Sequence, residues 1–235
     1  MSTKTRAASG AAARDTKNQI KAAAQLLFAR RGVEAVTIQQ IVAAAGQRNN
    51  AALHYHFGSK EELIRQLVVD GAAVIEERRH HLLRDIEARG GPFTIREILR
   101  VLVVPVIELG DDDRWRGYIR FISNLQSSDR ETLRAALNKR WNAGYVACFG
   151  HLKEMLRLPA ALVEQRLSIF SIYANAILSA REAAQETRTS NRLWGAPFTI
   201  ENILDTLEAA ITCSPSAQTL SMLESDLLRG RPLVR

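Results

Sequence analysis

The feature that most constrains the fold is a pair of short helical segments that follows Thr37. Thr37, with Gln40 three residues later, has the Ser/Thr-x-x-Glu/Gln pattern of a helix start. This pattern predicts a helix over residues 38–45, which Gly46 ends. A second short helix is predicted over residues 48–54. Two short helices joined by a tight glycine-containing turn form a helix-turn-helix, in which the second helix enters the major groove of DNA.

The start of this second helix carries side chains that can read bases. Arg48, Asn49, Asn50 and Ala51 are polar or small, whereas Leu53 can pack inward. Arginine makes bidentate contacts to guanine, asparagine makes them to adenine, and alanine can touch a thymine methyl group. The alternative interpretation is a capped, solvent-exposed helix start, where asparagine is common in any protein.

The rest of the chain predicts an all-α fold, because Ala, Leu, Arg and Glu are abundant and 46% of the 235 residues are hydrophobic. The first helix is expected to begin after Asp15 or Thr16. Residues 1–14 are expected to be a disordered arm, either a free end or a basic arm that touches DNA. Residues 187–198 are expected to form a polar loop. The other helices are predicted from Ser59 to Gly90, from Thr94 through Pro105, from Trp115 to Gln126, from Ser128 through Met155, from Pro159 through Leu178, from Thr199 through Ile211, and from Ser216 to Leu228.

The positive charge is concentrated near the N-terminus. The net charge is +7, and the first 62 residues hold nine Lys and Arg against four Asp and Glu. The remaining residues hold 23 against 21. A basic segment that coincides with a helix-turn-helix favours a nucleic-acid partner for that part of the chain.

The spacing of residues around the helix-turn-helix resembles the N-terminal domain of the tetracycline-repressor (TetR) family of bacterial regulators, over about residues 15–68. The pattern comprises Ile20, Ala24, Leu27, Phe28 and Gly32, then Thr37, Ile38, Ile41, Val42, Ala45 and Gly46, then Leu53, Tyr55, His56, Phe57, Ser59, Lys60, Glu61 and Leu63. The resemblance implies a homodimeric transcriptional regulator. It implies a DNA-binding domain over residues 15–62 and a larger helical domain over residues 63–235 that binds a ligand and dimerises.

The same resemblance assigns further DNA contacts. Thr37 matches a position that meets a phosphate, which agrees with the free N–H groups of a helix start. Lys60 matches a lysine near the DNA backbone. The family often reads Leu-Tyr-x-His-Phe, with the tyrosine on a phosphate, whereas this chain has His54 at that place and Tyr55 one residue later. Which of the two rings makes the contact stays open. His56 and Phe57 are expected to seat the recognition helix.

By the same resemblance, the dimer forms from the last two long helices, Leu162–Ala184 and Thr199–Thr212, as a four-helix bundle. The candidate contact residues are Phe170, Tyr173, Ile177, Ile203, Leu207 and Ile211. The alternative is that this apolar stripe packs only on its own subunit.

Aromatic residues with polar tips in the middle of the chain suit a concave apolar ligand site. The candidate ligand-binding residues are Trp115, Tyr118, Phe121, Trp141, Tyr145, Cys148 and Phe149; ordinary core packing is the alternative for each. Arg116 and Arg120 could hold an anion at the mouth of the site, or could pair with nearby acids such as Asp112 and Asp113.

The sequence argues against an enzyme and against a metal site or other cofactor. Glu77 and His80 have the Glu-x-x-His spacing of di-iron bundles, but no second copy is present. Together with Glu76 and His81 they are interpreted as a solvated helix face. Cys148 and Cys213 are expected to be buried free thiols. No apolar run is long enough to span a membrane and no signal peptide is apparent, so a cytoplasmic protein is expected.

Together with these observations, the resemblance implies a ligand-responsive regulator, expected to be a repressor, that binds a pseudo-palindromic operator in double-stranded DNA. A small hydrophobic or amphipathic effector is expected to move the long fourth helix. This movement would change the separation of the two recognition helices of the dimer. The alternative is a DNA-binding protein of the same fold without a small-molecule ligand, controlled by a protein partner or active in chromosome organisation.

Overall fold

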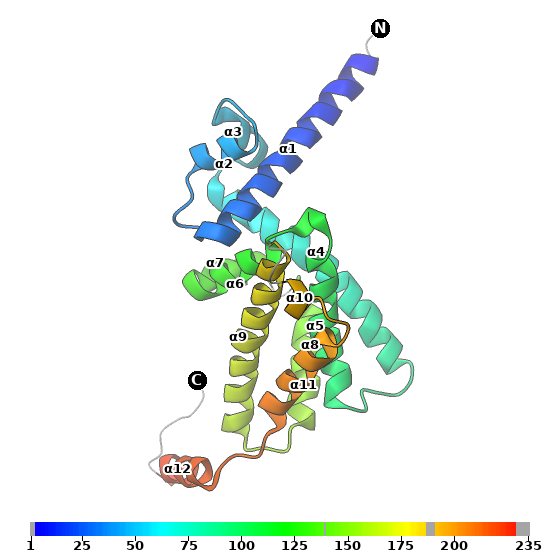
Figure 1. Cartoon of the computed structure of the whole chain (residues 1–235), viewed down its shortest axis with the longest axis vertical. Coiled ribbons are helices and arrows are strands. Elements are labelled where there is room, and N and C mark those ends of the chain that lie inside the picture. Colours follow the sequence, from blue (N-terminus) through cyan, green and yellow to red (C-terminus); the bar gives the residue numbers. More distant parts are fainter. Residues whose placement is uncertain (1–2, 139, 187–190, 229–235) are drawn as a thin grey trace.

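The computed structural model describes residues 3–138, 140–186 and 191–228. The described residues form helices and no strand, as expected (Figure 1). The elements in chain order are α1 (Thr3–Arg31), α2 (Ile38–Ala44), α3 (Ala51–Phe57), α4 (Lys60–Glu87), α5 (Ile95–Gly110), the 3-10 helix η1 (Asp113–Trp115), α6 (Tyr118–Ser128), α7 (Arg130–Leu137), α8 (Ala143–Met155), α9 (Ala160–Gln185), α10 (Asn191–Trp194), α11 (Thr199–Thr212) and α12 (Ala217–Leu228).

Helices α1 to α3 and the first half of α4 surround one hydrophobic core. Ile20 and Phe28 of α1, Ile41 of α2 and Leu53 of α3 are each 0% exposed. The predicted capping box at Thr37 is confirmed, because Thr37 Oγ1 accepts from Gln40 N and Gln40 Oε1 accepts from Thr37 N. The helix-turn-helix is therefore held from behind by the C-terminal half of α1 (Figure 1).

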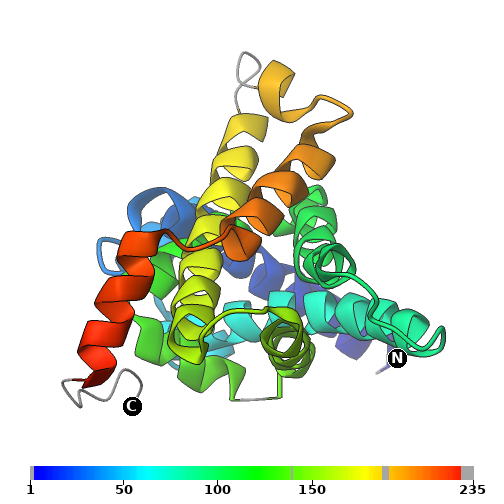
Figure 2. The same ribbon diagram turned by 90° about the horizontal axis from the view of Figure 1, so that it is seen from below.

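Helix α4 connects this core to the larger helical part, since it is a single helix of 28 residues. The predicted domain division between residues 62 and 63 falls in the first turn of α4, so α4 belongs to both parts. The first core also includes Tyr118, Phe121 and Leu125 of α6. A second core lies among α4, α5, α8, α9 and α11, and the end-on view shows α9 and α11 side by side (Figure 2).

Several predicted helix limits are wrong in the N-terminal and middle regions; among them, the helix predicted from Trp115 begins at Tyr118. Helix α1 begins at Thr3, so residues 3–14 are helical rather than a disordered arm; Met1 and Ser2 lie outside the described residues. This segment is rich in alanine, the best helix former, and it extends a helix that is already packed, so no new nucleation is needed. The recognition helix begins at Ala51, not at residue 48, and runs to Phe57.

Another error concerns the helix predicted from Ser128 through Met155, which is two helices. Asp129, not Ser128, is the cap, because its Oδ1 accepts from Thr132 N at 3.0 Å. Asn138 has a left-handed backbone with φ of 39°, which ends α7, and α8 begins at Ala143. Asparagine is among the few residues that adopt this conformation readily, and the apolar periodicity alone does not reveal the break.

Two predictions near the C-terminus also change. Residues 191–194 of the predicted polar loop form α10, whereas residues 187–190 lie outside the described part of the chain. Cys213 is exposed rather than buried, because it follows the last turn of α11; Cys148 is buried, as expected. Burial raises the pKa of the Cys148 thiol to about 12. The predicted helix starts at Thr94 and Thr199 are confirmed.

Candidate functional site

The recognition helix α3 has a buried face and an exposed face. Leu53 and Phe57 are 0% and 4% exposed and pack into the core shared with α1 and α2. His56 is half-buried beside Phe57 at 6.2 Å between ring centroids. This face therefore points into the core, as predicted for His56 and Phe57. The rest of α3 is exposed to solvent or to a partner.

The four predicted base-reading residues all lie exposed where α3 begins. The Asn49 side chain is engaged, since its Oδ1 accepts from Ala51 N at 2.9 Å and so replaces a missing helix bond. Arg48 and Asn50 have no side-chain hydrogen bond or ion pair within the described part of the chain, and Asn50 does not cap its own helix. Their donors and acceptors are therefore free for a partner.

His54 and Tyr55 differ in how they are held. His54 Nδ1 lies 2.9 Å from Gly58 O, and because a carbonyl only accepts, the ring donates there. This bond fastens the ring to the C-terminal end of α3, where Gly58 has a φ of 77°. Tyr55 is 82% exposed, and its ring packs in a T-shaped arrangement with His56, with ring centroids 5.0 Å apart. The His54 ring is therefore already bonded within the domain, whereas the Tyr55 hydroxyl group is free to contact a partner.

The Lys60 side chain is placed inside the domain. Its Nζ donates to Val33 O at 2.7 Å and lies 5.9 Å from the centre of the Phe28 ring. It therefore joins the start of α4 to the segment between α1 and α2. Thr37, in contrast, is exposed, and its hydroxyl proton is free because its oxygen is the acceptor in the capping box.

A cavity of about 300 Å³ lies in the larger part of the molecule, among α4 to α9. This volume is at the lower end for small-molecule sites. Its walls include Ala72, Ile75, Leu102, Val103, Val106, Ile119, Ile122, Leu133, Leu137, Phe170, Ala174 and Leu178. Of the predicted ligand-binding residues, Tyr118, Trp141 and Tyr145 line it.

The other four predicted ligand-binding residues lie outside the cavity wall. Phe121 is fully buried and stacks on Phe28 of α1 at 5.6 Å, and Trp115 packs against the same N-terminal core. Cys148 is fully buried in the second core. Phe149 stacks on Tyr145 at 4.3 Å and so supports a lining residue from behind.

The cavity also contains a buried ion pair that the sequence interpretation missed. Glu76 and Arg79 are 4% and 5% exposed, so Glu76 is not part of a solvated face. Arg79 Nη1 donates to Glu76 Oε1, and Gly144 N donates to Glu76 Oε2 at 2.6 Å. The signal was present in the sequence: Arg79 lies four residues after the apolar Ile75 and four before Leu83, on the buried stripe of α4.

Arg116 and Arg120 pair with acids, the alternative that the sequence left open. Arg116 lies 3.3 Å from Asp113. Arg120 contacts both Glu182 and Glu186 of α9, and Glu182 also accepts from the backbone N–H groups of Ile119 and Arg120. Although burial raises the pKa of Glu186, Arg120 and the other nearby arginines outweigh it, and the net pKa is lowered. These arginines fasten α6 to its neighbours.

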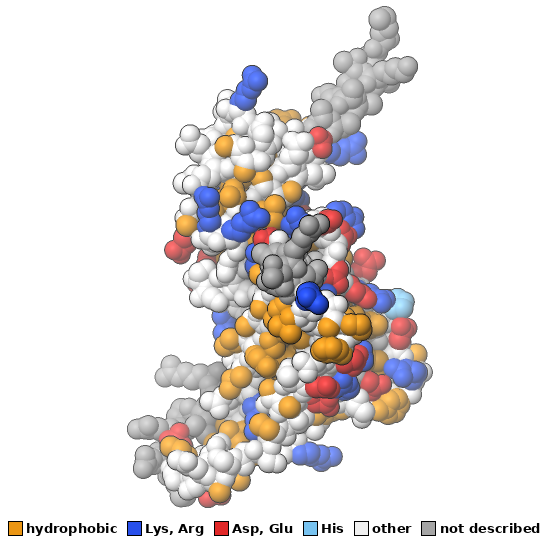
Figure 3. Space-filling model, viewed as in Figure 1, with side chains coloured by type: hydrophobic (Ala, Val, Ile, Leu, Met, Phe, Trp, Pro, Cys, Tyr) orange, Lys and Arg blue, Asp and Glu red, His pale blue; other side chains and the backbone are white. Residues whose placement is uncertain are grey.

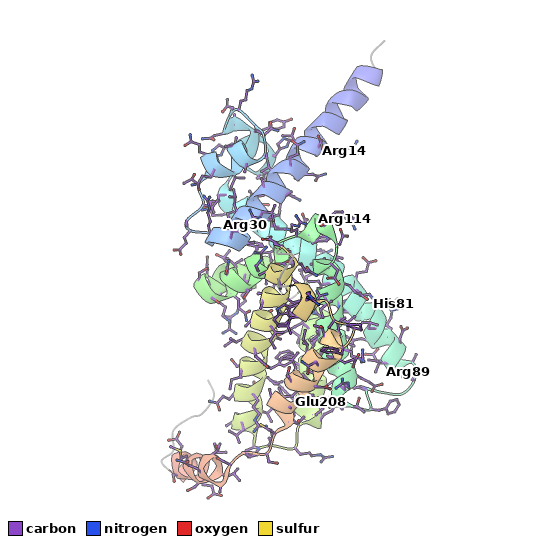
Figure 4. All side chains as sticks on the ribbon, viewed as in Figure 1. Arg14, Arg30, His81, Arg89, Arg114 and Glu208 are labelled. Carbon is purple, nitrogen blue, oxygen red and sulfur yellow. The ribbon has the colours of Figure 1, made fainter. Side chains whose placement is uncertain are left out.

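Two helices link the cavity to the DNA-binding domain. Helix α4 carries Ala72, Ile75, Glu76 and Arg79 in the cavity wall and begins beside α3. Helix α6 lines the cavity with Ile122 while its other side packs on α1: Asn124 Nδ2 donates to Phe28 O at 3.1 Å and to Ala29 O at 3.2 Å. Arg30, at the end of α1, adds an ion pair to Glu186 of α9 at 3.6 Å (Figure 4).

The predicted dimer residues are mostly core residues. Phe170, Ile203, Leu207 and Ile211 are at most 4% exposed in the chain's own second core, so they offer no face to another copy. Ile177 packs against that core, and Tyr173 is 37% exposed. Residues on the opposite side of α9 are exposed instead, including Ile169 at 53% and Ile172 at 64%.

Apolar side chains are also exposed on α10, which packs on α9, and just before α11. Figure 3 shows hydrophobic side chains gathered on the face over α9 to α11. Leu193 of α10 and Phe198, which precedes α11, are 72% and 65% exposed. Isolated exposed apolar side chains are ordinary, but a contiguous patch marks an interaction site.

Within the described residues, no group of three or more His, Cys, Asp or Glu side chains could hold a metal ion. None of the described helices is long and apolar enough to cross a membrane.

Together, these features define a class of protein: an all-helical chain with an N-terminal helix-turn-helix and a larger helical part that encloses a cavity. Residues 20–67 match the family model described as bacterial regulatory proteins, tetR family. The N-terminal domain of this chain thus belongs to the tetR family, and the chain has the fold of a TetR-family transcriptional regulator.

Solved structures are similar to this chain at low sequence identity. The probable transcriptional regulatory protein RHA5900 is 17% identical, with a TM-score of 0.53, over 85% of this chain and 100% of that one. Superantigen PfiT is 18% identical over 85% and 97% of the two chains, with a TM-score of 0.48. The TetR family regulator PfmR of Thermus thermophilus is 18% identical over 82% and 96%, also with a TM-score of 0.48. A comparison with curated proteins finds no match.

Proposed function

We propose that the protein is a non-enzymatic transcriptional regulator, a repressor that binds a pseudo-palindromic DNA operator as a homodimer and is released by a small-molecule effector. The observation that carries the proposal is the unpartnered polar start of the recognition helix. Arg48 and Asn50 are exposed and without side-chain partners in the described structure, while Leu53 and Phe57 hold the helix from behind. If Arg48 and Asn50 served only the fold, we would expect their side chains to pair within the chain.

Each exposed residue has a separate role in this proposal. Arg48 and Asn50 read base edges, because both can make bidentate contacts there. Tyr55 and Thr37 donate to phosphates through their free hydroxyl groups and set the position of α3 on the duplex. Asn49 orients the start of α3 through its bond to Ala51 N, and its amide N–H groups remain available.

Dimerisation follows from how little DNA a single recognition helix can read. One such helix contacts only a few base pairs, and two-fold related copies read two half-sites one helical turn apart. The apolar side of α9 with Ile169, Ile172 and Tyr173 supports the contact between copies, because a helix that is apolar on two faces needs two packing partners.

The cavity supports the effector step. A ligand shifts a two-state equilibrium only if it binds the two states differently. A ligand that contacts Ile75 on α4 and Ile122 on α6 touches both helices that reach the DNA-binding domain. Movement of either helix changes the position of α3 in one subunit relative to the other. A regulator without an effector is the alternative, and it has no specific observation in its favour here.

The decisive experiment selects bound sequences from a random double-stranded DNA library at near-physiological salt. A pseudo-palindrome with half-sites about ten base pairs apart is expected. Asn50→Ala should then weaken binding to the selected site by about 1–3 kcal/mol and leave binding to a scrambled site unchanged. Recovery of DNA without any common sequence would refute the proposal.

A charge control separates base reading from simple attraction. Arg48→Ala and Arg84→Ala each remove one positive charge, and both side chains are exposed and lack ion-pair partners in the described part of the chain. Arg84 lies near the far end of α4, away from α3. Only Arg48→Ala is expected to lower the preference for the selected site. Equal losses in both variants would show that Arg48 contributes charge alone.

A further inference from the structure

The cavity wall contains two arginines whose side chains are unpaired within the described structure. Arg130 and Arg134 lie one turn apart on α7, and both line the cavity while remaining exposed, so they lie where the cavity meets solvent. Neither has a hydrogen-bond or ion-pair partner in the described residues. Arg116 and Arg120, which the sequence singled out, are instead occupied by Asp113, Glu182 and Glu186.

The other charges of the cavity cancel. Glu76 is neutralised by Arg79 and by the N–H of Gly144. The remaining donors of Arg79 point to Val101 O at 3.4 Å and Leu102 O at 3.3 Å, so this guanidinium is satisfied within the protein. Within the described structure, Arg130 and Arg134 are the only charged lining residues without an ion-pair partner. The opening of the cavity is therefore positively charged, and its walls are apolar.

A further observation places this charge beside the ligand space. Burial raises the pKa of the Tyr145 phenol, while its hydrogen bond with Ser171 and the charges of Arg79 and Arg130 oppose the rise. Arg130 is therefore close enough to act on a lining hydroxyl, and Tyr145 lines the same cavity.

We propose that the cavity binds a small amphipathic carboxylate, with its apolar body against Ile122 and Leu133 and its carboxylate held by Arg130 and Arg134. Guanidinium groups match carboxylates in geometry and charge, and they remain charged at all physiological pH values. This inference rests on the proposed function in one respect: the bound carboxylate is the effector. The binding itself can be measured without DNA.

The test compares three molecules with the same chain and different heads, namely octanoate, octan-1-ol and octyltrimethylammonium. Binding to the full-length protein is measured by calorimetry and by the shift of its thermal unfolding midpoint, which should rise with the logarithm of ligand concentration. Octanoate is expected to bind at least about tenfold more tightly than either of the others, since charge-assisted bonds contribute about that factor.

Variants assign the preference to the two arginines. Arg130→Gln and Arg134→Gln should each weaken octanoate binding about tenfold and leave octan-1-ol unaffected. Arg84→Gln, the same change at an exposed arginine on α4 that does not line the cavity, should change neither. Equal binding of the three molecules, no binding of octanoate, or octanoate binding that does not depend on Arg130 and Arg134 would each overturn the inference.

A separate readout keeps the two proposals apart. If octanoate binds as expected but leaves DNA binding unchanged, the carboxylate site stands and the release step of the proposed function fails. If the selected DNA site is bound specifically but octanoate is no better than octan-1-ol, the regulator stands and the carboxylate assignment fails.

Discussion

Replacing Gly71 by alanine is expected to destabilise the protein, although the same change stabilises most helices. Gly71 of α4 lies against the ring of Tyr118 of α6, and an added Cβ would be 2.2 Å from Tyr118 Cζ. Tyr118 is only 3% exposed, and its hydroxyl donates to Val68 O at 2.9 Å. The ring therefore cannot move aside without losing a buried hydrogen bond.

Two effects of opposite sign determine the size of the change. Alanine in place of glycine within a helix stabilises by about 1 kcal/mol. Forcing an extra methyl group into a packed site costs about 1–3 kcal/mol, and losing the tyrosine hydrogen bond adds roughly 1 kcal/mol. The free energy of unfolding is therefore expected to fall by about 2 kcal/mol, which lowers the thermal midpoint by roughly 4–8 °C in a chain of this size.

Urea unfolding followed by circular dichroism measures this change, and α8 offers a matched control. Gly150 has nothing within 4 Å of an added Cβ, so Gly150→Ala should stabilise by about 0.5–1 kcal/mol. In a Tyr118→Leu background, Gly71→Ala should lose most of its cost. A Gly71→Ala protein as stable as the unaltered chain, with Gly150→Ala behaving as expected, would refute the close contact between α4 and α6.

Two further predictions concern the DNA-binding domain and the contact between copies. Lys60→Met should lower the free energy of unfolding by about 1–2 kcal/mol, because Val33 O loses the shorter of its two hydrogen bonds and keeps only the one from Val36 N. The variant should leave the salt dependence of DNA binding unchanged; a flatter salt slope would instead place Lys60 on a phosphate. Ile172→Arg should convert the proposed dimer to a monomer, as measured by light scattering, whereas Val146→Arg, at a similarly exposed apolar residue of α8, should not. A dimer that survives Ile172→Arg would exclude this side of α9 from the interface.

The helix-turn-helix could be located from the sequence because its signals are local. The capping box at Thr37 and the glycine after α2 each depend on residues a few positions apart, and the structure has them as expected. The exposed start of α3 follows from the same local pattern, with the helix beginning three residues later than predicted. Local signals of this kind do not depend on how the rest of the chain packs.

The sequence leaves the partner of a side chain open where that partner lies far along the chain. Lys60 bonds Val33 O, 27 residues away, and Arg120 bonds Glu182, 62 residues away. Phe121 was expected in the ligand site but packs on Phe28 of α1 instead. In each case, the sequence gives the type of side chain but not the residue that it contacts.

The sequence by itself determined most of the helices, the polar residues at the exposed start of α3 and the family resemblance, because periodicity, caps and turns are encoded by neighbouring residues. The tertiary structure alone decided which helix faces meet. It placed Glu76 and Arg79 in a cavity wall, left Arg130 and Arg134 at its mouth, and separated the core side of α9 from its exposed apolar side. An apolar stripe specifies that a face is buried, but its partner follows only from the packing of all the helices together.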